Sequence, residues 1–331
     1  MKSKIIQKDI LFNKFSNQLK KFKTLRKGDK IVVAVSGGLD SVALLILLNE
    51  IQQYNLIVAH VNHNLRTESI HEQAFVENLS HSLDIPFYYK ILNPNSRNNK
   101  YSIEEWARYE RYYYFDELLK QTNSKWIMTA HHGNDNVETI LMNIARHSGI
   151  LGMRGIAKER NSLLRPMLEF TKNEITEFSE RAGFHFFEDL SNYDNIYLRN
   201  FLRNIVIKPW EKQVPHLISG FTKSIDYFKQ WQVGLDFLIK NYLMEDIKKF
   251  EDKFELPIDL IHSLPNIIRI RLFQLLINKK NIPWSKHHIK MLIQFIEKSK
   301  VGDFHKLHNG WRLLRDRNCI KVELRKKIIK N

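Results

Sequence analysis

The sequence predicts an α/β protein with a doubly wound, mostly parallel sheet of the Rossmann-like kind, followed by a smaller, mainly helical domain. Three observations support this prediction. Short apolar runs alternate with helix-like segments between residues 31 and 147, as in repeated β–α units. A glycine-rich turn joins the first apolar run directly to an apolar helix. From about residue 222 onward, long helical patterns replace the alternation.

In the first domain, we expect each strand to be followed by a helix. A short amphipathic helix over residues 4–22 precedes them. The expected strands cover residues 31–35, 56–61, 87–92 and 126–130, and the expected helices cover residues 42–53, 69–83, 102–121, 134–147 and 171–182.

The domain boundary is placed at residue 213, because Pro209 and Pro215 bracket a stretch suited to a linker. Residues 1–213 then form the catalytic domain and residues 214–331 a mainly helical domain. In the second domain we expect helices over residues 222–243, 265–278 and 285–297, then short alternating runs at 311–314 and 319–324, and a basic tail at 325–330.

The composition indicates the class of partner. The 331 residues include 52 Lys and Arg against 36 Asp and Glu, a formal net charge of +16 at pH 7. This charge favours a polyanion, with nucleic acid ahead of a membrane. Cys319 is the only cysteine, which excludes an intrachain disulfide and an all-cysteine metal or iron–sulfur site. The sequence shows no secretory signal and no membrane-spanning run, so we expect a cytoplasmic protein without a membrane partner.

The most informative segment is the turn at residues 36–41, which we name the phosphate loop. Its residues are Ser36, Gly37, Gly38, Leu39, Asp40 and Ser41. The glycines allow a sharp turn, and the helix start offers N–H groups and a positive dipole end to phosphate. Asp40 fits a cation that bridges phosphates. The loop lacks the lysine of a GxxxxGKS/T motif, which excludes an ordinary P-loop NTPase. The alternative is a glycine-rich turn without a ligand.

Two further polar clusters follow predicted strands, at the sheet edge where open parallel sheets bind ligands. After the second strand, the cluster that contains His60 and Asn62 can place backbone groups against an adenine, with Arg66 available for phosphate or RNA. The alternative is a polar strand exit that caps the next helix. After the fourth strand, Asp135 and Glu138 lie one helical turn apart on one face, suited to Mg²⁺ or an ammonium group.

The two histidines before these acids leave a second interpretation open. His131 and His132 could join Asp135 and Glu138 in a metal site with two imidazoles and two carboxylates. Adjacent residues on a strand point to opposite faces, however. We therefore favour acids that face the substrate and one histidine that serves packing.

Two arginine pairs are candidates for anion binding. Arg108 and Arg111 share a face of the third helix and can reach phosphates or nucleic acid, although Arg108 also has Glu104 as an i, i+4 partner. Arg199 and Arg203 form a like-charge i, i+4 pair, which is unfavourable unless an anion lies between them. Phosphate or RNA is one such anion. Charge balance with Asp189 and Asp194 is the alternative.

Taken together and in this order, the motifs resemble the short form of tRNA(Ile)-lysidine synthase, a family of the pyrophosphate-loop, or N-type ATP pyrophosphatase, superfamily. The matching stretches are SGGLDS, HVNHNLR, EEWARYERY, TAHHGNDNVETILM and DLSNYDNIYLRNFLRN. The family commonly shows two successive acids and a Gln where this chain has Asn134, Asp135 and Asn136. Longer members also carry a further C-terminal domain.

The resemblance implies a two-step ligation that uses ATP and Mg²⁺. ATP activates C2 of the wobble cytidine in a tRNA(Ile) with a CAU anticodon, and free L-lysine then displaces AMP to give lysidine, so that the tRNA reads AUA instead of AUG. The implied catalytic residues are Asp40, which also holds the metal, Arg108, Asp135 and Glu138. The implied ATP-binding residues are Ser36, Gly37, Gly38, Leu39, Asp40, Ser41, His60, Asn62, Arg108 and Arg111. Lysine binding is implied for His132, Asp135 and Glu138, and tRNA binding for Arg66, Arg199 and Arg203.

Other functions stay open at this point. A tRNA thiolation enzyme of the same superfamily relies on cysteines that are usually paired, and the lone Cys319 argues against it. An amidotransferase needs a glutaminase with a nucleophilic cysteine. A basic module that binds ATP or RNA without chemistry belongs to a different class. A homodimer is a further open possibility.

Overall fold

The chain folds into two compact units. The structure is a computed structural model that describes residues 3–66, 68–98, 101–146, 148–188, 194, 196–277, 284–307 and 310–324. One unit comprises Met1–His147 with Arg154–Ile225, and the other comprises Ser148–Met153 with Asp226–Asn331. Packing alone defines these units, so the boundary at residue 213 stays a prediction about functional domains. The basic tail and part of the stretch around residues 189–195 lie outside the described residues.

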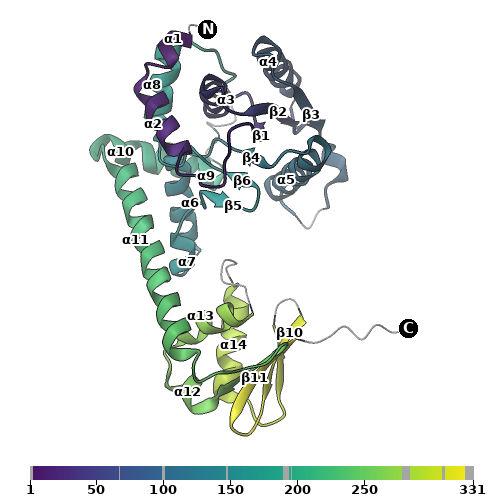
Figure 1. Cartoon of the computed structure of the whole chain (residues 1–331), viewed down its shortest axis with the longest axis vertical. Coiled ribbons are helices and arrows are strands. Elements are labelled where there is room, and N and C mark those ends of the chain that lie inside the picture. Colours follow the sequence, from purple (N-terminus) through teal and green to yellow (C-terminus); the bar gives the residue numbers. More distant parts are fainter. Residues whose placement is uncertain are drawn as a thin grey trace. The chain divides into compact units, whose positions relative to one another are not determined.

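A six-stranded sheet forms the centre of the first unit (Figure 1). Its strand order is β3-β2-β1-β4-β6-β5, and every neighbouring pair is parallel except β5 and β6. The strands are β1 (Lys30–Ala34), β2 (Asn55–Asn62), β3 (Phe87–Ile91), β4 (Trp126–Met128), β5 (Glu159–Arg160) and β6 (Leu163–Leu164). The predicted mostly parallel sheet is confirmed. The order reverses between β1 and β4, which is where open α/β sheets bind ligands.

Helices cover both faces of this sheet, because successive residues of a strand point to opposite sides. Ile31 and Val33 of β1 pack into one core with residues of α2, α3 and α8, whereas Val32 packs into a second core with residues of α5. The helices of this unit are α1 (Ser3–Ile6), α2 (Ile10–Leu19), α3 (Leu39–Ile51), α4 (Ser69–Ser82), η1 (Pro94–Ser96), α5 (Ile103–Thr122), α6 (Gly133–Ala145), α8 (Lys172–Ala182), α9 (Leu198–Phe201), η3 (Leu202–Ile207) and α10 (Lys208–Gln213). Helix α11 (Leu217–Leu238) has residues in both units.

Two helix boundaries differ from the prediction for local reasons. The single helix expected over residues 4–22 is two helices, because Asp9 caps the second one with a carboxylate that accepts from Leu11 N at 2.7 Å. The helix expected from residue 42 begins at Leu39, because Gly38 takes the N-cap position. As a result, Asp40 lies in the first turn of α3, where the helix dipole favours an acid.

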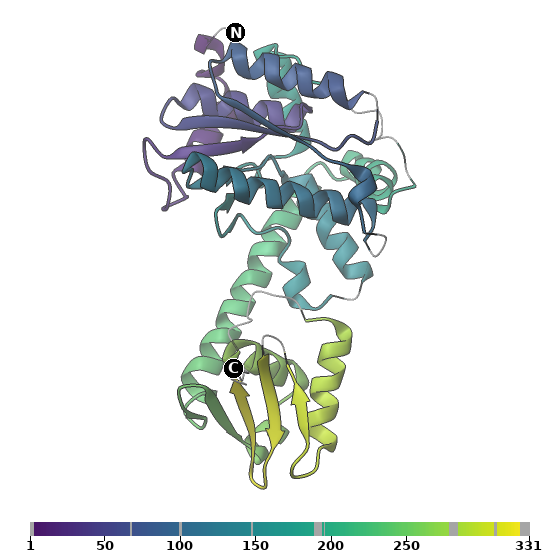
Figure 2. The same cartoon turned by 90° about the vertical axis from the view of Figure 1, so that its right-hand side faces the viewer.

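The second unit is not mainly helical, which corrects the prediction. It contains a five-stranded antiparallel sheet of order β7-β8-β11-β10-β9 (Figure 2). The strands are β7 (Lys248–Lys249), β8 (Lys253–Pro257), β9 (Phe304–Lys306), β10 (Trp311–Arg315) and β11 (Cys319–Leu324), and the remaining helices are α7 (Ile150–Met153), η4 (Ile239–Leu243), α12 (Ile258–Ser263), α13 (Asn266–Leu276) and α14 (Lys286–Lys298).

The sheet was missed because its strands are short and because β8 pairs with β11, some sixty residues away. A local pattern cannot show such pairing. Leu256, Ile320 and Val322 are buried between half-buried neighbours and pack one face of the sheet against α13 and α14. None of the helices among the described residues is long and apolar enough to cross a membrane.

Asp9 also makes an ion pair, which generates a prediction about stability and pH. Arg181 Nε donates to Asp9 Oδ2 at 2.7 Å. Burial alone raises the pKa of Asp9, but hydrogen bonds from Arg181 and from Leu11 N outweigh it and lower the pKa below 3.8. The charge therefore stabilises the fold above that value, and the contribution disappears as the pH falls through the lower folded-state pKa.

We expect Asp9→Asn, which keeps the cap, to reduce the free energy of unfolding by about 1 kcal/mol near neutral pH. The loss should shrink toward zero in acid. Urea unfolding of both proteins across this pH range measures it. A loss that does not change with pH would contradict the ion-pair explanation.

Candidate active site

The phosphate loop leaves the carboxyl end of β1 and closes on itself through its two serines. Ser36 N donates to Ser41 Oγ at 3.1 Å, and Ser41 Oγ donates to the Gly38 carbonyl at 2.9 Å. Gly37 has φ +97°, where only glycine is unstrained, and a Cβ there would lie 3.3 Å from Val76. No side chain among those that the structure describes caps α3 at Gly38. Its first N–H groups are therefore available to an anion.

Asp40 lies between a lysine and a histidine. Lys172 Nζ donates to Asp40 Oδ1 at 2.7 Å, and His132 Nε2 lies 3.6 Å from Asp40 Oδ2. Burial opposes ionisation of Asp40, but His132 and Lys172 hold the pKa of its carboxyl well below its usual range. Asp40 is therefore a carboxylate at any physiological pH.

His132 connects Asp40 to the acids at the start of α6. Its Nε2 is also 3.6 Å from Asp135 Oδ2, and its backbone N–H donates to the same oxygen at 2.9 Å. Burial disfavours the imidazolium, but Asp135 and Asp40 together raise the pKa of His132 above its ordinary value. His132 thus contacts both acids and does more than fill space.

Asp135 and Glu138 do lie side by side, but the chain itself neutralises them. Arg199 Nε and Arg203 Nε donate to the two oxygens of Glu138 at 2.5 and 2.6 Å. Both guanidinium groups also approach Asp135 Oδ1, at 3.3 and 3.5 Å. We name these four residues the acid–arginine cluster. The anion that the like-charge arginines require is a carboxylate of the same chain, chiefly that of Glu138. Of the two alternative partners, Asp189 lies outside the described residues.

The two-histidine metal site is not formed. Among the residues that the structure describes, no group of three or more His, Cys, Asp and Glu side chains is arranged to hold a metal ion. His131 Nδ1 instead contacts Thr129 Oγ1 at 2.9 Å. Burial and the nearby arginines lower the pKa of His131, so it is a neutral imidazole.

Of the polar residues at the end of β2, some have a structural role and others can still contact a ligand. Asn62 is buried, and its amide donates to the Ser69 carbonyl and to Gln73, so it fixes the start of α4. His60 Nδ1 contacts the Val35 carbonyl at 2.9 Å, whereas its buried Nε2 has no hydrogen-bond partner among the described residues. Arg66 lies nearby on the surface and pairs with Glu72 at 3.3 Å.

Arg108 and Arg111 both make cation–π contacts with the ring of Tyr112. Their guanidinium carbons lie 5.1 and 5.6 Å from the centre of the Tyr112 ring. Arg165, just beyond β6, approaches the same tyrosine and donates to the Ala157 carbonyl at 2.7 Å. Among described residues no carboxylate pairs with these three arginines. They form an uncompensated cationic group, and Arg165 and Lys172 are the residues that sequence reasoning missed.

The unusual asparagines beside Asp135 have structural partners. Asn134 Oδ1 accepts from Lys172 N at 2.9 Å, and its Nδ2 donates to Glu211 at 3.1 Å. Asn136 Oδ1 accepts from Ile156 N at 2.6 Å, and a Cβ on Gly155 would meet it at 2.1 Å. Both amides therefore tie α6 to later segments of the chain.

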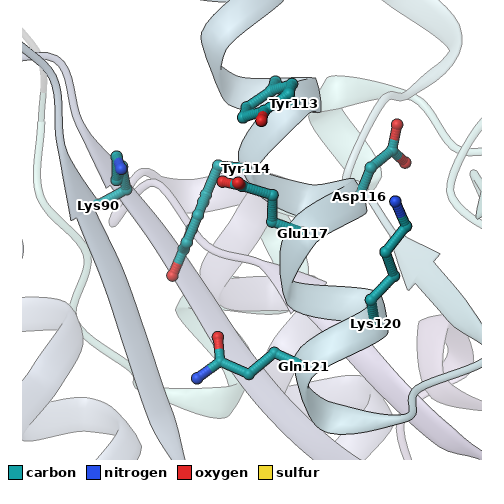
Figure 3. Close-up of a pocket in the computed structure, with 7 residues that line it drawn as sticks. All are labelled: Lys90, Tyr113, Tyr114, Asp116, Glu117, Lys120 and Gln121. Carbon is teal, nitrogen blue, oxygen red and sulfur yellow. The ribbon is translucent and has the colours of Figure 1, made fainter.

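A separate hollow of about 660 Å³ lies between β3 and α5 (Figure 3). It is lined by Lys90, Tyr113, Tyr114, Asp116, Glu117, Lys120 and Gln121. Burial raises the pKa of Tyr114 to about 12. The walls carry two cations and two acids, so the hollow favours no ligand charge, and it contains none of the predicted site residues.

A phosphate-binding turn at the switch point of a parallel sheet defines a nucleotide-binding α/β protein. The chain matches the PP-loop domain family over residues 11–209 and belongs to that family. In its fold, the chain resembles the U34-tRNA thiolase NcsA from Methanococcus maripaludis with its 4Fe–4S cluster, with a TM-score of 0.54 at 15% identity over 66% of this chain and 80% of that one.

Curated relatives within this family are tRNA(Ile)-lysidine synthases, which confirms the resemblance that the motifs show. The chain is 35% identical to the tRNA(Ile)-lysidine synthase of Thermosipho africanus over 75% of this chain and 59% of that protein. It is 34% identical to the Enterococcus faecalis enzyme over 69% and 50%, and 28% identical to the Persephonella marina enzyme over 94% and 69%. The chain thus spans between half and three fifths of the length of the first two.

Removal of the Glu138 charge should destabilise the protein, because two arginines lose their principal partner. We expect Glu138→Gln to reduce the free energy of unfolding by about 2 kcal/mol, less than for a fully buried pair because both arginines reach solvent. Glu177→Gln is the matched control, since Glu177 pairs with Arg181 on the surface at 3.4 Å; it should change stability by less than about 0.5 kcal/mol. Urea unfolding measures both, and equal losses would contradict the role given to the cluster.

Proposed function

We propose that this chain is an ATP-dependent ligase that attaches free L-lysine to C2 of the wobble cytidine in a tRNA(Ile) with a CAU anticodon. The observation that carries the proposal is the direct link from the phosphate loop through Asp40 and His132 to the acid–arginine cluster. One end of this arrangement suits a nucleoside triphosphate and the other suits an amino acid. The similarity to three lysidine synthases supports the same assignment.

The first step requires ATP with its α-phosphate open to attack by the cytidine O2. The N–H groups of the phosphate loop and the hydroxyl of Ser36 bind the phosphates. Ser41 supports them by holding the loop closed through the Gly38 carbonyl. His60 Nε2, which is buried and has no hydrogen-bond partner in the described part of the chain, is available to the adenine. Arg108 and Arg111 lie among the uncompensated cations and offset the charge that develops on the departing pyrophosphate.

Asp40 fits the usual way in which Mg²⁺ is held beside phosphates. Mg²⁺ takes one or two carboxylates, with phosphate oxygens and water completing its coordination. Asp40 is ionised and its side chain is 29% exposed, so it offers oxygen ligands to an ion that arrives with ATP. When bound, the ion supplies positive charge to the phosphates.

The second step requires lysine, which carries two ammonium groups and a carboxylate. The acid–arginine cluster presents groups of both signs, so Asp135 and Glu138 suit an ammonium group while Arg199 and Arg203 suit the carboxylate. The ε-amine, once deprotonated, bonds to C2 as the C2–O bond to AMP breaks. His132 lies between the phosphate loop and the acid–arginine cluster, and its backbone N–H holds Asp135 in place.

The net charge of +16 supports an RNA substrate. Arg66 on the surface beyond β2 is the best placed of the three arginines assigned to tRNA. Arg199 and Arg203 are engaged by carboxylates, so a phosphate contact there requires an exchange of partners. Thiolation is less well supported, because Cys319 is the only cysteine and lies in β11 of the second unit.

Asp40→Asn should reduce pyrophosphate release by about 100-fold or more, because it removes the proposed metal ligand while the side chain keeps its size. The measurement is pyrophosphate release with ATP, Mg²⁺ and unmodified tRNA(Ile) of CAU anticodon. A rate near that of wild type would remove Asp40 from the mechanism.

Asp135→Asn should chiefly weaken the binding of the lysine substrate. We expect the lysine concentration at half-maximal rate to rise about 10-fold to 100-fold, since a hydrogen bond to a charged group contributes about 1.5–3 kcal/mol. The control is Asp116→Asn, an exposed acid on α5, which should leave the lysine dependence unchanged. An unchanged lysine dependence for Asp135→Asn would show that lysine binds elsewhere.

The function itself is tested by incorporation of radiolabelled lysine into the tRNA. Label that appears only with ATP and the CAU anticodon supports the ligase. Binding of tRNA and ATP without pyrophosphate release would support a non-catalytic module instead. Pyrophosphate without label would keep the first step and assign a different nucleophile.

A further inference from the structure

The phosphate loop has no lysine of its own, yet a lysine from far along the chain contacts it. Lys172 is the first residue of α8, and its Nζ lies 2.7 Å from Asp40 Oδ1 across 132 positions of sequence. The side chain of Lys172 is 38% exposed and that of Asp40 is 29% exposed. Both charged ends are therefore accessible to a ligand.

The backbone of Lys172 is held by contacts that do not involve Asp40. Thr171 and Glu174 form a capping box at the start of α8, with Thr171 Oγ1 accepting from Glu174 N and Glu174 accepting from Thr171 N. Lys172 N donates to Asn134 Oδ1 at the start of α6. The backbone is thus fixed between two helix starts, and the four-carbon side chain is the part that can change partner.

Lys172 and a divalent cation require the same carboxylate. Lys172 holds Oδ1 of Asp40, and His132 lies near Oδ2. A doubly charged ion attracts the carboxylate more strongly than an ammonium group at the same distance. Lys172 would therefore leave Asp40 when Mg²⁺ and ATP arrive. Its ammonium group would then lie close to the phosphates that the loop N–H groups bind.

We infer that Lys172 changes partner, neutralising Asp40 before ATP binds and then pairing with the β- and γ-phosphates. The inference rests on the proposed function for its assignment of ATP cleavage to this loop. As the cytidine O2 bonds to the α-phosphorus, the bond to pyrophosphate breaks and the leaving group gains negative charge. Lys172 keeps its proton and supplies only charge. Lys172 thus has the same function as the lysine within a GxxxxGKS/T loop, which contacts the β- and γ-phosphates.

The test compares Lys172→Met with Lys172→Arg in two measurements. The first is the affinity for Mn²⁺ alone, followed by electron paramagnetic resonance, which needs neither RNA nor lysine. The second is pyrophosphate release. The matched control is Lys14→Met, because Lys14 pairs with Glu174 on the same helix at 2.8 Å and does not contact the loop.

The two measurements should move in opposite directions. Lys172→Met should bind Mn²⁺ up to about 10-fold more tightly, because the competing ammonium is gone, and should release pyrophosphate about 100-fold more slowly. Lys172→Arg should restore most of the rate, and Lys14→Met should resemble wild type in both. Circular dichroism and the thermal midpoint check that each variant is folded.

Other outcomes would overturn the inference. If Lys172→Met changed neither measurement, the ion pair would be an idle surface contact. If it weakened Mn²⁺ binding and slowed release together, and Lys172→Arg did not restore them, Lys172 would only position α8. A wild-type chain that releases no pyrophosphate would refute the proposed function, whereas tighter Mn²⁺ binding by Lys172→Met would still establish the competition for Asp40.

Discussion

Three carboxylates converge beyond the carboxyl ends of β1 and β4, and a fold that buries them must bring cations to the same place. Glu138 is fully buried and Asp135 nearly so, and an unpaired charge in such a position is strongly destabilising. The chain meets this requirement with Arg199 and Arg203 for the two acids of α6 and with Lys172 for Asp40. His132 lies between Asp40 and Asp135 and so connects the phosphate loop with the acids of α6. These ion pairs hold α8 and the segment from α9 to η3 beside the site, together with apolar packing such as that of Ile175 and Phe178.

This compensation shapes how ligands enter the proposed site. A site with bare carboxylates would attract any cation, whereas here each acid already has a partner. A divalent ion or a lysine ammonium group therefore enters by exchange, and the released cation becomes available to the anionic part of the incoming ligand. Both proposals have this form: Lys172 passes from Asp40 to phosphate, and Arg199 and Arg203 pass from the acids toward a carboxylate.

The sequence predicts well what is local and poorly what is not. Residues 36–41 are readable because strand, turn and helix start are adjacent, and the β–α alternation identifies the parallel sheet for the same reason. The spacing of Arg199 and Arg203 predicts an anion between them, but only the fold shows that the anion is Glu138, more than sixty positions earlier. Lys172 resembles an ordinary residue in a capping box. Likewise, the second sheet was missed because β8 finds its partner only at β11.

The strand order of the second unit has a consequence for synthesis of the chain. In the order β7-β8-β11-β10-β9, the central strand is the last to be made. Until residue 324 has left the ribosome, β8 and β10 each present an unpaired edge, and edges of this kind pair readily with other chains. Closure of the sheet therefore waits for synthesis of β11, while the strands of the first unit are complete much earlier. Nascent chains stopped before β11 should accordingly be the form of this protein most prone to aggregation and most dependent on chaperones.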